Sequence, residues 1–298
     1  MILAPLRGVT VRRFRLTFGG IARECGFTEA VTPFIPAMCG LDPLKDAELA
    51  GGGAKEPLET VPQFIGKDPS ELRRCAARVR EAGYAHADLN CGCPFPMVVK
   101  KGRGGGLLRS PDALAKMLEA GCEAFGPGAF SAKTRLGVES PRELLRLMPV
   151  FNAFPLRRLV VHARTVKQMY SGECDLDAFR EAAAVAKMPV VYNGDVDLAV
   201  GPGGIAARLP SGRAEGWPLV MCGRAFVRFL GARSDSPGLL DGYIRDSLAE
   251  GASPGAVLGR MKELLSYWAA LPAWAEVWSR AKKARSLDSF CEVVFAKA

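Results

Sequence analysis

This sequence has few of the side chains that bind metals, and it has no long apolar segment. Only two of its 298 residues are histidines, and its nine cysteines show no regular spacing. Cys91 and Cys93 lack a second cysteine pair or a histidine cluster at ligand spacing, so we expect no metal site. No signal peptide is evident, and no apolar run reaches the roughly 18 residues that a membrane span needs. These features predict a reducing, cytoplasmic location and no membrane partner.

The G-x-G-x-x-G fingerprint of dinucleotide-binding sheets is also missing, which weighs against a doubly wound fold. What recurs instead is a short apolar run followed by a helical segment, with roughly 25 to 45 residues between successive runs. The runs are Ile2 to Pro5, Thr28 to Val31, Val61 to Ile65, Ala87 to Asn90, Ser131 to Thr134, Leu159 to His162, Val190 to Asn193 and Leu219 to Cys222. Eight such units predict a TIM (β/α)8 barrel. Pro69, Pro111 and Pro141 stand where the first turns of helices are expected.

From about Pro237 the sequence indicates helices only. Ser253-Pro254 is a start signal, and a stripe at helical spacing follows it that we interpret mainly as core packing: Val257, Met261, Leu264, Leu265 and Trp268. We therefore predict a barrel domain over 1-235 and a small all-helical domain over 236-298. The net charge of +9 lies mainly on the first part, with 32 Lys+Arg against 24 Asp+Glu. This excess suggests an anionic partner.

Polar or charged residues, with one proline and one glycine, stand at or near the carboxyl ends of the predicted strands. They are Pro5, Glu29, Gln63, Asn90, Lys133, His162, Asn193 and the pair Gly223-Arg224. Any one of them could be a solvated strand end or a satisfied buried polar group. Together they are more easily explained as a site, because barrel enzymes build their chemistry at this face.

The chemistry of these residues suits a large, flat, polar cofactor that carries a phosphate. Gln63 and Asn90 can donate and accept along the edge of a heterocycle, and Lys133 supplies a positive charge. Gly194 and Gly223-Arg224 follow the last two strands, where barrels commonly bind phosphate. Flavin mononucleotide (FMN) meets all of these demands.

The stretch from Asp88 to Leu108 concentrates reactive and flexible residues. Cys93 lies between Gly92 and Pro94, which can aim its sulfur while ending the strand. Its thiol could act as a nucleophile or as an acid, and a buried structural cysteine is the plainer alternative.

Several motifs together resemble the tRNA-dihydrouridine synthase family, from residue 2 to about 230. They are Ala4-Pro5-Leu6-Arg7-Gly8-Val9-Thr10, Phe27-Thr28-Glu29, Asp88-Leu89-Asn90-Cys91-Gly92-Cys93-Pro94, Gly104-Gly105-Gly106-Leu107-Leu108, Lys133-Thr134-Arg135-Leu136-Gly137, His162-Ala163-Arg164-Thr165, Tyr170-Ser171-Gly172 and Asn193-Gly194-Asp195. The resemblance implies an FMN-dependent reduction of the C5–C6 double bond of a uridine in tRNA, with NADPH as the hydride source.

The resemblance also implies roles for individual residues. Cys93 would be the proton donor to C5, so its thiol form would be the useful one. The implied FMN contacts are Pro5, Leu6, Arg7, Gln63, Lys133, His162, Asn193, Gly194, Asp195, Gly223 and Arg224. Asn90 would frame the base, and the implied RNA contacts are Lys100, Lys101, Arg260, Lys262, Tyr267, Arg280, Lys282, Lys283 and Arg285.

Three positions depart from the family pattern. Val11 stands where the family usually has an acidic residue, Arg7 replaces a smaller or neutral residue, and the stretch from Gly201 to Trp217 is glycine-rich where a regular helix is usual. The alternatives are a dihydrouridine synthase acting on ribosomal RNA, a small-molecule FMN reductase, and an RNA-binding module without turnover. We expect a monomer that binds tRNA and not DNA. The Asn-Cys-Gly-Cys-Pro form and the helix from Lys262 to Tyr267 favour the bacterial subgroup that acts on uridine 16.

Overall fold

A parallel sheet curled into a barrel forms the first part of the chain. The computed structural model describes residues 1–49, 56–201, 204–208 and 219–296. The barrel strands are β1 (Ile2–Leu3), β2 (Glu29–Val31), β3 (Ile35–Pro36), β4 (Glu59–Val61), β5 (Gln63–Ile65), β6 (Ala87–Cys91), β7 (Phe130–Arg135), β8 (Leu159–His162), β9 (Val190–Asn193) and β12 (Val220–Cys222). Their order is β3-β5-β6-β7-β8-β9-β12-β1-β2-β4. Every predicted strand is present, and the TIM-type barrel is confirmed.

The barrel closes through two interrupted strands. β2 pairs with β4 and β3 pairs with β5, so the two ends of the sheet order are joined along the chain. β4 and β5 are separated only by Pro62, which has no N–H to donate to a neighbouring strand. The Pro62 carbonyl still accepts from the Asp88 N–H at 2.9 Å, which keeps the two halves in one barrel wall.

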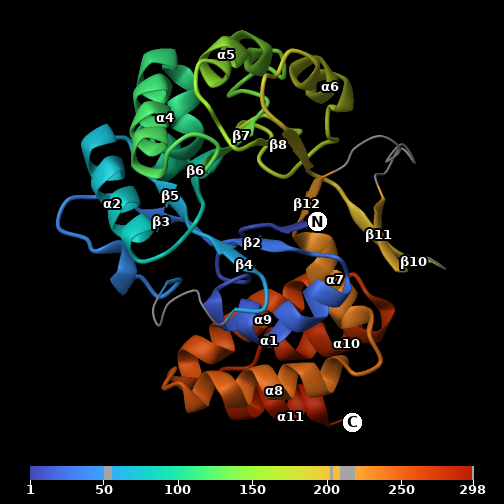
Figure 1. The fold of residues 1–298 in the computed structure, drawn as a ribbon. Helices are drawn as coiled ribbons and strands as arrows, with labels where there is room; N and C mark the ends of the chain where they lie inside the picture. The colour runs from blue at the N-terminus through green and yellow to red at the C-terminus, as the bar shows by residue number, and fades with distance from the viewer. Residues whose placement is uncertain (50–55, 202–203, 209–218, 297–298) are drawn as a thin grey trace.

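Helices pack around the outside of the barrel (Figure 1). They are α1 (Arg12–Glu24), α2 (Pro69–Glu81), α4 (Pro111–Phe125), α5 (Glu143–Asn152), α6 (Leu176–Ala184) and α7 (Arg224–Ala232). Pro69 and Pro111 open their helices as predicted, whereas Pro141 lies two residues before α5. A short helix, α3 (Pro96–Val99), and a 3-10 turn, η3 (Gly104–Arg109), follow β6, and a further 3-10 turn, η1 (Pro43–Lys45), precedes β4.

Two cores hold these layers together. Inside the barrel a small apolar cluster includes Ile2, Val31, Val61, Val160 and Met221. Between the sheet and the helices lies a much larger cluster, which continues into the C-terminal helices. Alternation along each strand sends successive side chains to one core or the other.

The glycine-rich departure predicted from Gly201 onward coincides in part with a hairpin. β10 (Asp197–Gly201) pairs antiparallel with β11 (Gly204–Arg208) in a separate two-stranded sheet. Where the family resemblance leads one to expect a helix, the described part of this region is therefore extended. Residues 209–217 lie outside the described part of the chain.

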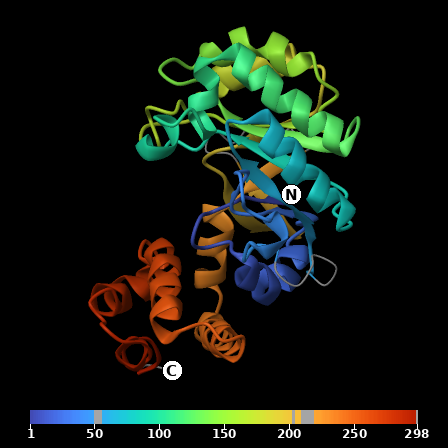
Figure 2. The ribbon, with the colours of Figure 1, turned by 90° about the vertical axis from the view of Figure 1, so that its left-hand side faces the viewer.

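Four helices follow the barrel and lie together at one side of it (Figure 2). They are α8 (Ser236–Ala249), α9 (Pro254–Trp268), α10 (Pro272–Ala281) and α11 (Leu287–Phe295). Trp268 Nε1 donates to the Val227 carbonyl at 2.6 Å, and Trp274 Nε1 donates to that of Gly231 at 2.8 Å, so two buried indoles fasten these helices to α7. The division into domains at residues 235 and 236 stays a prediction. Within the described residues, no helix is long and apolar enough to span a membrane.

Candidate active site

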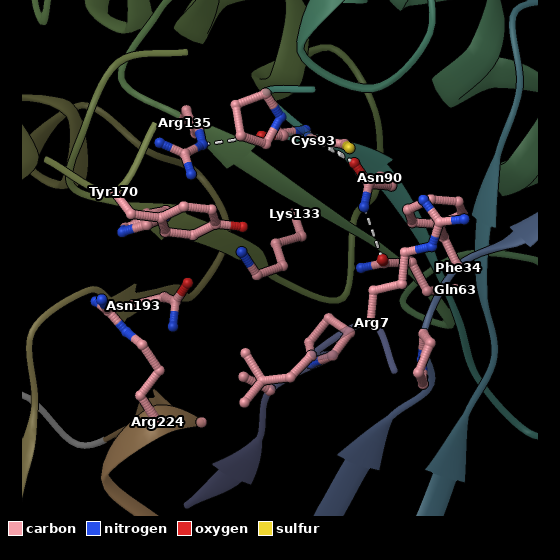
Figure 3. A pocket seen from close by; sticks show the side chains of 18 of the residues that line it. Arg7, Phe34, Gln63, Asn90, Cys93, Lys133, Arg135, Tyr170, Asn193 and Arg224 are labelled. Atoms are coloured by element: carbon pink, nitrogen blue, oxygen red, sulfur yellow. Dashed lines mark hydrogen bonds between the residues drawn. The ribbon is translucent and has the colours of Figure 1, made fainter. Parts of the chain in front are cut away.

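A cavity of about 430 Å³ opens at the carboxyl ends of the barrel strands (Figure 3). Most of the predicted site residues line it: Pro5, Leu6, Arg7, Gln63, Asn90, Cys93, Lys133, His162, Asn193, Gly194, Gly223, Arg224 and Tyr267. The last of these comes from α9, so the C-terminal helices contribute part of the wall.

Cys93 is buried on a turn that glycines make possible. Its carbonyl accepts from the Gly105 N–H at 3.0 Å, which brings the glycine-rich turn η3 against the cysteine. A Cβ at Gly104 would lie 2.8 Å from the Cys93 Cβ, and one at Gly106 would lie 2.5 Å from the Val99 carbonyl oxygen. The three consecutive glycines therefore allow close packing beneath Cys93.

Asn90 connects this turn to the neighbouring strand. Its Oδ1 accepts from the backbone N–H of Cys93 at 2.9 Å and from that of Gly92 at 3.1 Å. Its Nδ2 donates to Gln63 Oε1 at 2.8 Å. The amide of Asn90 thus fixes the start of the cysteine turn and lies beside the amide of Gln63.

Burial and neighbouring cations set the protonation of the polar wall. Burial, aided by Arg135, lowers the pKa of Lys133 to about 8, so Lys133 is still mostly protonated at pH 7. Burial and the nearby cations, first Arg135 and then Lys133, lower the pKa of His162 well below its usual range, so its imidazole is neutral. Burial also raises the pKa of the Cys93 thiol. At neutral pH the cavity therefore offers a lysine cation, a neutral histidine and a protonated thiol.

Arg135 ends β7 and joins two loops, one after β6 and one between β8 and α6. Its Nε donates to the Gly92 carbonyl at 2.9 Å, and its Nη1 donates to those of Thr165 at 2.8 Å and Met169 at 2.5 Å. Met169 has a φ of 51°, which is uncommon for a residue other than glycine. The guanidinium also lies 5.2 Å from the centre of the Tyr170 ring. Arg135 thereby joins the Cys93 turn to the loop that carries Tyr170.

The other end of the cavity suits an anion. Gly223 caps α7, and a Cβ there would lie 3.0 Å from the Ala4 Cβ, so only glycine keeps this approach without displacement. Arg224, the first residue of α7, donates from Nη2 to Asp195 Oδ1 at 2.8 Å. Asp195 was predicted as a flavin contact, but it does not line the cavity. Its carboxylate instead joins Arg224 to the buried Arg164, which donates to Asp195 Oδ2 at 2.6 Å.

Glu29 was predicted to contribute to this face, and that prediction is wrong. It begins β2 instead of ending it, and its carboxylate receives two hydrogen bonds each from Arg157 and Arg158. Both arginines directly precede β8, so the cluster lies at the amino ends of the strands. These hydrogen bonds and charges outweigh burial and lower the pKa of Glu29 to about 2.

The predicted RNA contacts do not line the cavity, apart from Asn90 and Tyr267. Lys100 and Lys101 are exposed where α3 ends, and Arg280, Lys282, Lys283 and Arg285 are exposed in and after α10. Arg260 is half-buried on α9. Lys262, also half-buried, donates to the Ala284 carbonyl at 2.5 Å and so joins α9 to the segment before α11.

The cavity also contains residues to which the sequence assigned no role. Arg135 and Tyr170 stand inside quoted motifs, and the spacing of Lys133 and Arg135 on one strand would have placed both on the same face. Phe34 lies 5.6 Å from the guanidinium carbon of Arg7, and Glu263 on α9 lines the mouth. No local pattern in the sequence indicates Phe34 or Glu263.

Comparison with known proteins assigns the chain to a family. The model of the family described as "Dihydrouridine synthase (Dus)" matches residues 2–228. The chain is 33% identical to tRNA-dihydrouridine(16) synthase of Cupriavidus necator, over 66% of this chain and 62% of that protein. It is 30% identical to tRNA-dihydrouridine synthase B of Vibrio cholerae, over 66% of this chain and 60% of that protein. Each of these two alignments thus covers less than two thirds of the relative.

A third similarity extends through the C-terminal helices. The chain is 27% identical to tRNA-dihydrouridine synthase B of Pseudomonas aeruginosa over 99% of this chain and 91% of that protein. The family model covers the barrel strands and most of the residues that line the cavity. This chain belongs to the dihydrouridine synthase family.

Proposed function

We propose that this protein reduces a uridine of tRNA to 5,6-dihydrouridine, with FMN as cofactor and NADPH as reductant. The observation that carries the proposal is the arrangement in one cavity of a protonated, buried thiol at Cys93, the amides of Gln63 and Asn90, and a cationic end at Arg224. Membership of the family and the names of the relatives support the same reaction.

The residues of the cavity fit FMN by the chemistry of their donors. Gln63, Asn193 and Lys133 offer amides and a cation to the polar edge of a flat ring. Arg224 and the amino end of α7, with Gly223 at its cap, suit a phosphate. Bound FMN would supply the hydride for C6 of the uracil. His162 is neutral and would add a hydrogen-bonding group without further positive charge.

Cys93 would hold the proton that C5 receives. Because burial raises the pKa of its thiol, the proton stays on sulfur at neutral pH. Asn90 accepts from the N–H groups of Gly92 and Cys93, and Arg135 donates to the Gly92 carbonyl, which would aim the thiol. Lys100 and Lys101 are exposed, and so they are better suited to RNA phosphate than to ionising the thiol.

The RNA would lie across the mouth of the cavity, between the barrel loops and α9. Tyr267 lines the cavity from that helix, and the exposed Lys282, Lys283 and Arg285 follow α10. The target uridine would have to leave its stack to enter. Tyr170 is half-exposed between the guanidinium groups of Arg135 and Arg224, at 5.2 and 5.8 Å, and presents an aromatic ring at the mouth.

The test is a single-turnover assay with an unmodified tRNA transcript. FMN-loaded protein is reduced with NADPH without oxygen and mixed with the tRNA, and we expect rapid flavin reoxidation and dihydrouridine in the nuclease digest. Reoxidation by free uridine at the same rate would favour a small-molecule reductase, and reoxidation by ribosomal RNA alone would change the substrate. No reoxidation by any of these would contradict the proposal.

A further inference from the structure

Asp88 is a carboxylate inside the barrel, where the neighbouring layer is apolar. It is 1% exposed and lies on β6, two residues before Asn90, so both side chains point to the barrel interior. Its partners in the ladder are Gln63 on β5 and Ser131 on β7. Burying a carboxylate is costly unless it is hydrogen-bonded, so its contacts need an explanation.

A chain of hydrogen bonds leads from Asp88 to the backbone of Cys93. Gln63 Nε2 donates to Asp88 Oδ2 at 2.7 Å, and Asn90 Nδ2 donates to Gln63 Oε1 at 2.8 Å. The Cys93 N–H then donates to Asn90 Oδ1 at 2.9 Å. An ionised carboxylate can only accept, so Gln63 must turn its NH₂ group towards Asp88 and its oxygen towards Asn90. This order leaves the oxygen of Asn90 facing the N–H groups of Gly92 and Cys93, which can only donate and so favour the same orientation of Asn90.

We propose that Asp88 is a positioning residue, which stabilises the amide orientations of Gln63 and Asn90 and thereby stiffens the turn that carries Cys93. Asp88 does not line the cavity, and it acts through the two amides. The consequence for turnover rests on the proposed function, in which Cys93 supplies a proton. The orientation of the amides itself does not depend on that reaction.

Asp88 stabilises this order only while it is ionised. Burial raises its pKa to about 6, and the hydrogen bond from Gln63 and the charges of Arg158 and Lys133 act in the opposite direction. The other titratable neighbour is the thiol of Cys91 on the same strand, whose pKa burial raises well above its usual range. A protonated Asp88 can donate as well as accept, so it no longer requires the NH₂ group of Gln63, and the backbone N–H groups of Gly92 and Cys93 alone then favour this order through Asn90. The contribution of Asp88 to the order is therefore present above about pH 6 and lost below it.

The first test follows the Cys93 turn without any RNA. In D88N the new amide can meet Gln63 in either orientation, so it no longer stabilises the order of the amides. We expect Cys93 to react with iodoacetamide at least threefold faster, as measured by mass spectrometry of the modified peptide. S131A is the matched control: Ser131 is the buried ladder partner of Asp88, its hydroxyl makes no hydrogen bond to any described residue, and its loss should leave the rate unchanged. An unchanged or slower rate in D88N would overturn the proposal.

A double variant separates orientation from simple loss of a charge. In D88N/Q63E the carboxylate stands at position 63, where it can accept from the amide introduced at position 88 and from Asn90, so the orientation of Asn90 is fixed again. We expect its rate of Cys93 alkylation to return to within a factor of two of wild type. A double variant as reactive as D88N would assign Asp88 a merely structural role.

The second test measures flavin reoxidation by tRNA between pH 5 and pH 8. We expect the wild-type reoxidation rate to fall as the pH drops below about 6. The rate of D88N should be at least tenfold lower than that of wild type at pH 7.5, and it should not change between pH 7.5 and pH 5. If the reoxidation rate of D88N fell below about pH 6 in the same way as that of wild type, the proposed role of Asp88 would be contradicted. If RNA does not reoxidise the wild-type protein at all, the proposed function fails, whereas the alkylation rates still decide the role of Asp88.

Discussion

Asp195 holds Arg224 at the cationic end of the cavity, with Arg224 Nη2 donating to Asp195 Oδ1 at 2.8 Å. The same carboxylate accepts from Arg164, and these two arginines lower its pKa against the opposing effect of burial. Asp195 thus restrains the side chain that would meet a phosphate, from a place outside the cavity wall.

Replacing Asp195 by alanine should weaken FMN binding. Arg224 and Arg164 would lose their shared acceptor, and the freed side chains would have to be ordered by the ligand. We expect the dissociation constant, measured by quenching of FMN fluorescence, to rise about tenfold, or about 1.4 kcal/mol. D177A removes a carboxylate that pairs with Arg180 on the exposed surface of α6, and it should leave the constant unchanged. Equal effects of the two variants would contradict a local role for Asp195.

Cys93 provides a test of the proton donor. With C93A we expect NADPH to reduce the bound flavin at the wild-type rate, while reoxidation by tRNA slows at least a hundredfold, in the range by which acid catalysts act. In the wild type the raised pKa keeps the thiol protonated, so the reoxidation rate should not fall through loss of this proton until the pH exceeds the ordinary range of a cysteine. C122A, at a buried cysteine on α4, is the matched control. Full dihydrouridine formation by C93A would exclude Cys93 as the acid.

The eight strands could be predicted because each run and its following helix leave a pattern within about 40 residues. The roles of Glu29 and Arg135 could not be predicted from the sequence. Glu29 differs from a residue of the active face only in beginning its strand, and its partner Arg158 is 129 residues away. Arg135 needs acceptors from two loops, Gly92 in one and Thr165 and Met169 in the other, and no local pattern predicts that these loops converge.

The Glu29 cluster should make stability depend on pH in acid. Because the folded pKa of about 2 is below the ordinary 4.5, the contribution is complete above about pH 4.5 and is lost as the pH falls towards 2. E29Q leaves the buried Arg158 without its charge partner, so we expect it to lower the free energy of unfolding by about 3 kcal/mol at pH 7 and by much less near pH 2.5. E59Q changes the exposed ladder neighbour of Glu29 and should have little effect in urea unfolding. A loss independent of pH would show that the charge of Glu29 is not its source.

The contact between α7 and α9 should tolerate no added methyl group. A Cβ at Gly231 would lie 2.5 Å from the indole of the buried Trp268, so G231A must displace that ring. We expect a loss of about 1–3 kcal/mol in the free energy of unfolding. G238A is the control, because no atom of the described residues lies within 4 Å of a Cβ at that position of α8. It should leave stability unchanged or raise it by up to about 1 kcal/mol. Equal stability of the two variants would contradict the packing of α7 on α9.

The exposed cations after α10 should contribute to RNA binding through phosphate. Lys282, Lys283 and Arg285 are all exposed. Replacing all three by glutamine should weaken tRNA binding and lower the magnitude of the slope of log K against log salt by up to about 2–3, at roughly 0.7–0.9 per contact. Filter binding between 50 and 200 mM salt would measure this slope. K116Q is the control, and it should leave the affinity and the slope unchanged. It changes an exposed lysine on α4, which packs on the barrel away from the C-terminal helices (Figure 2). If the triple variant keeps both the wild-type affinity and the wild-type slope, these cations belong to ordinary solvated surface, and the RNA must be held by other groups around the mouth.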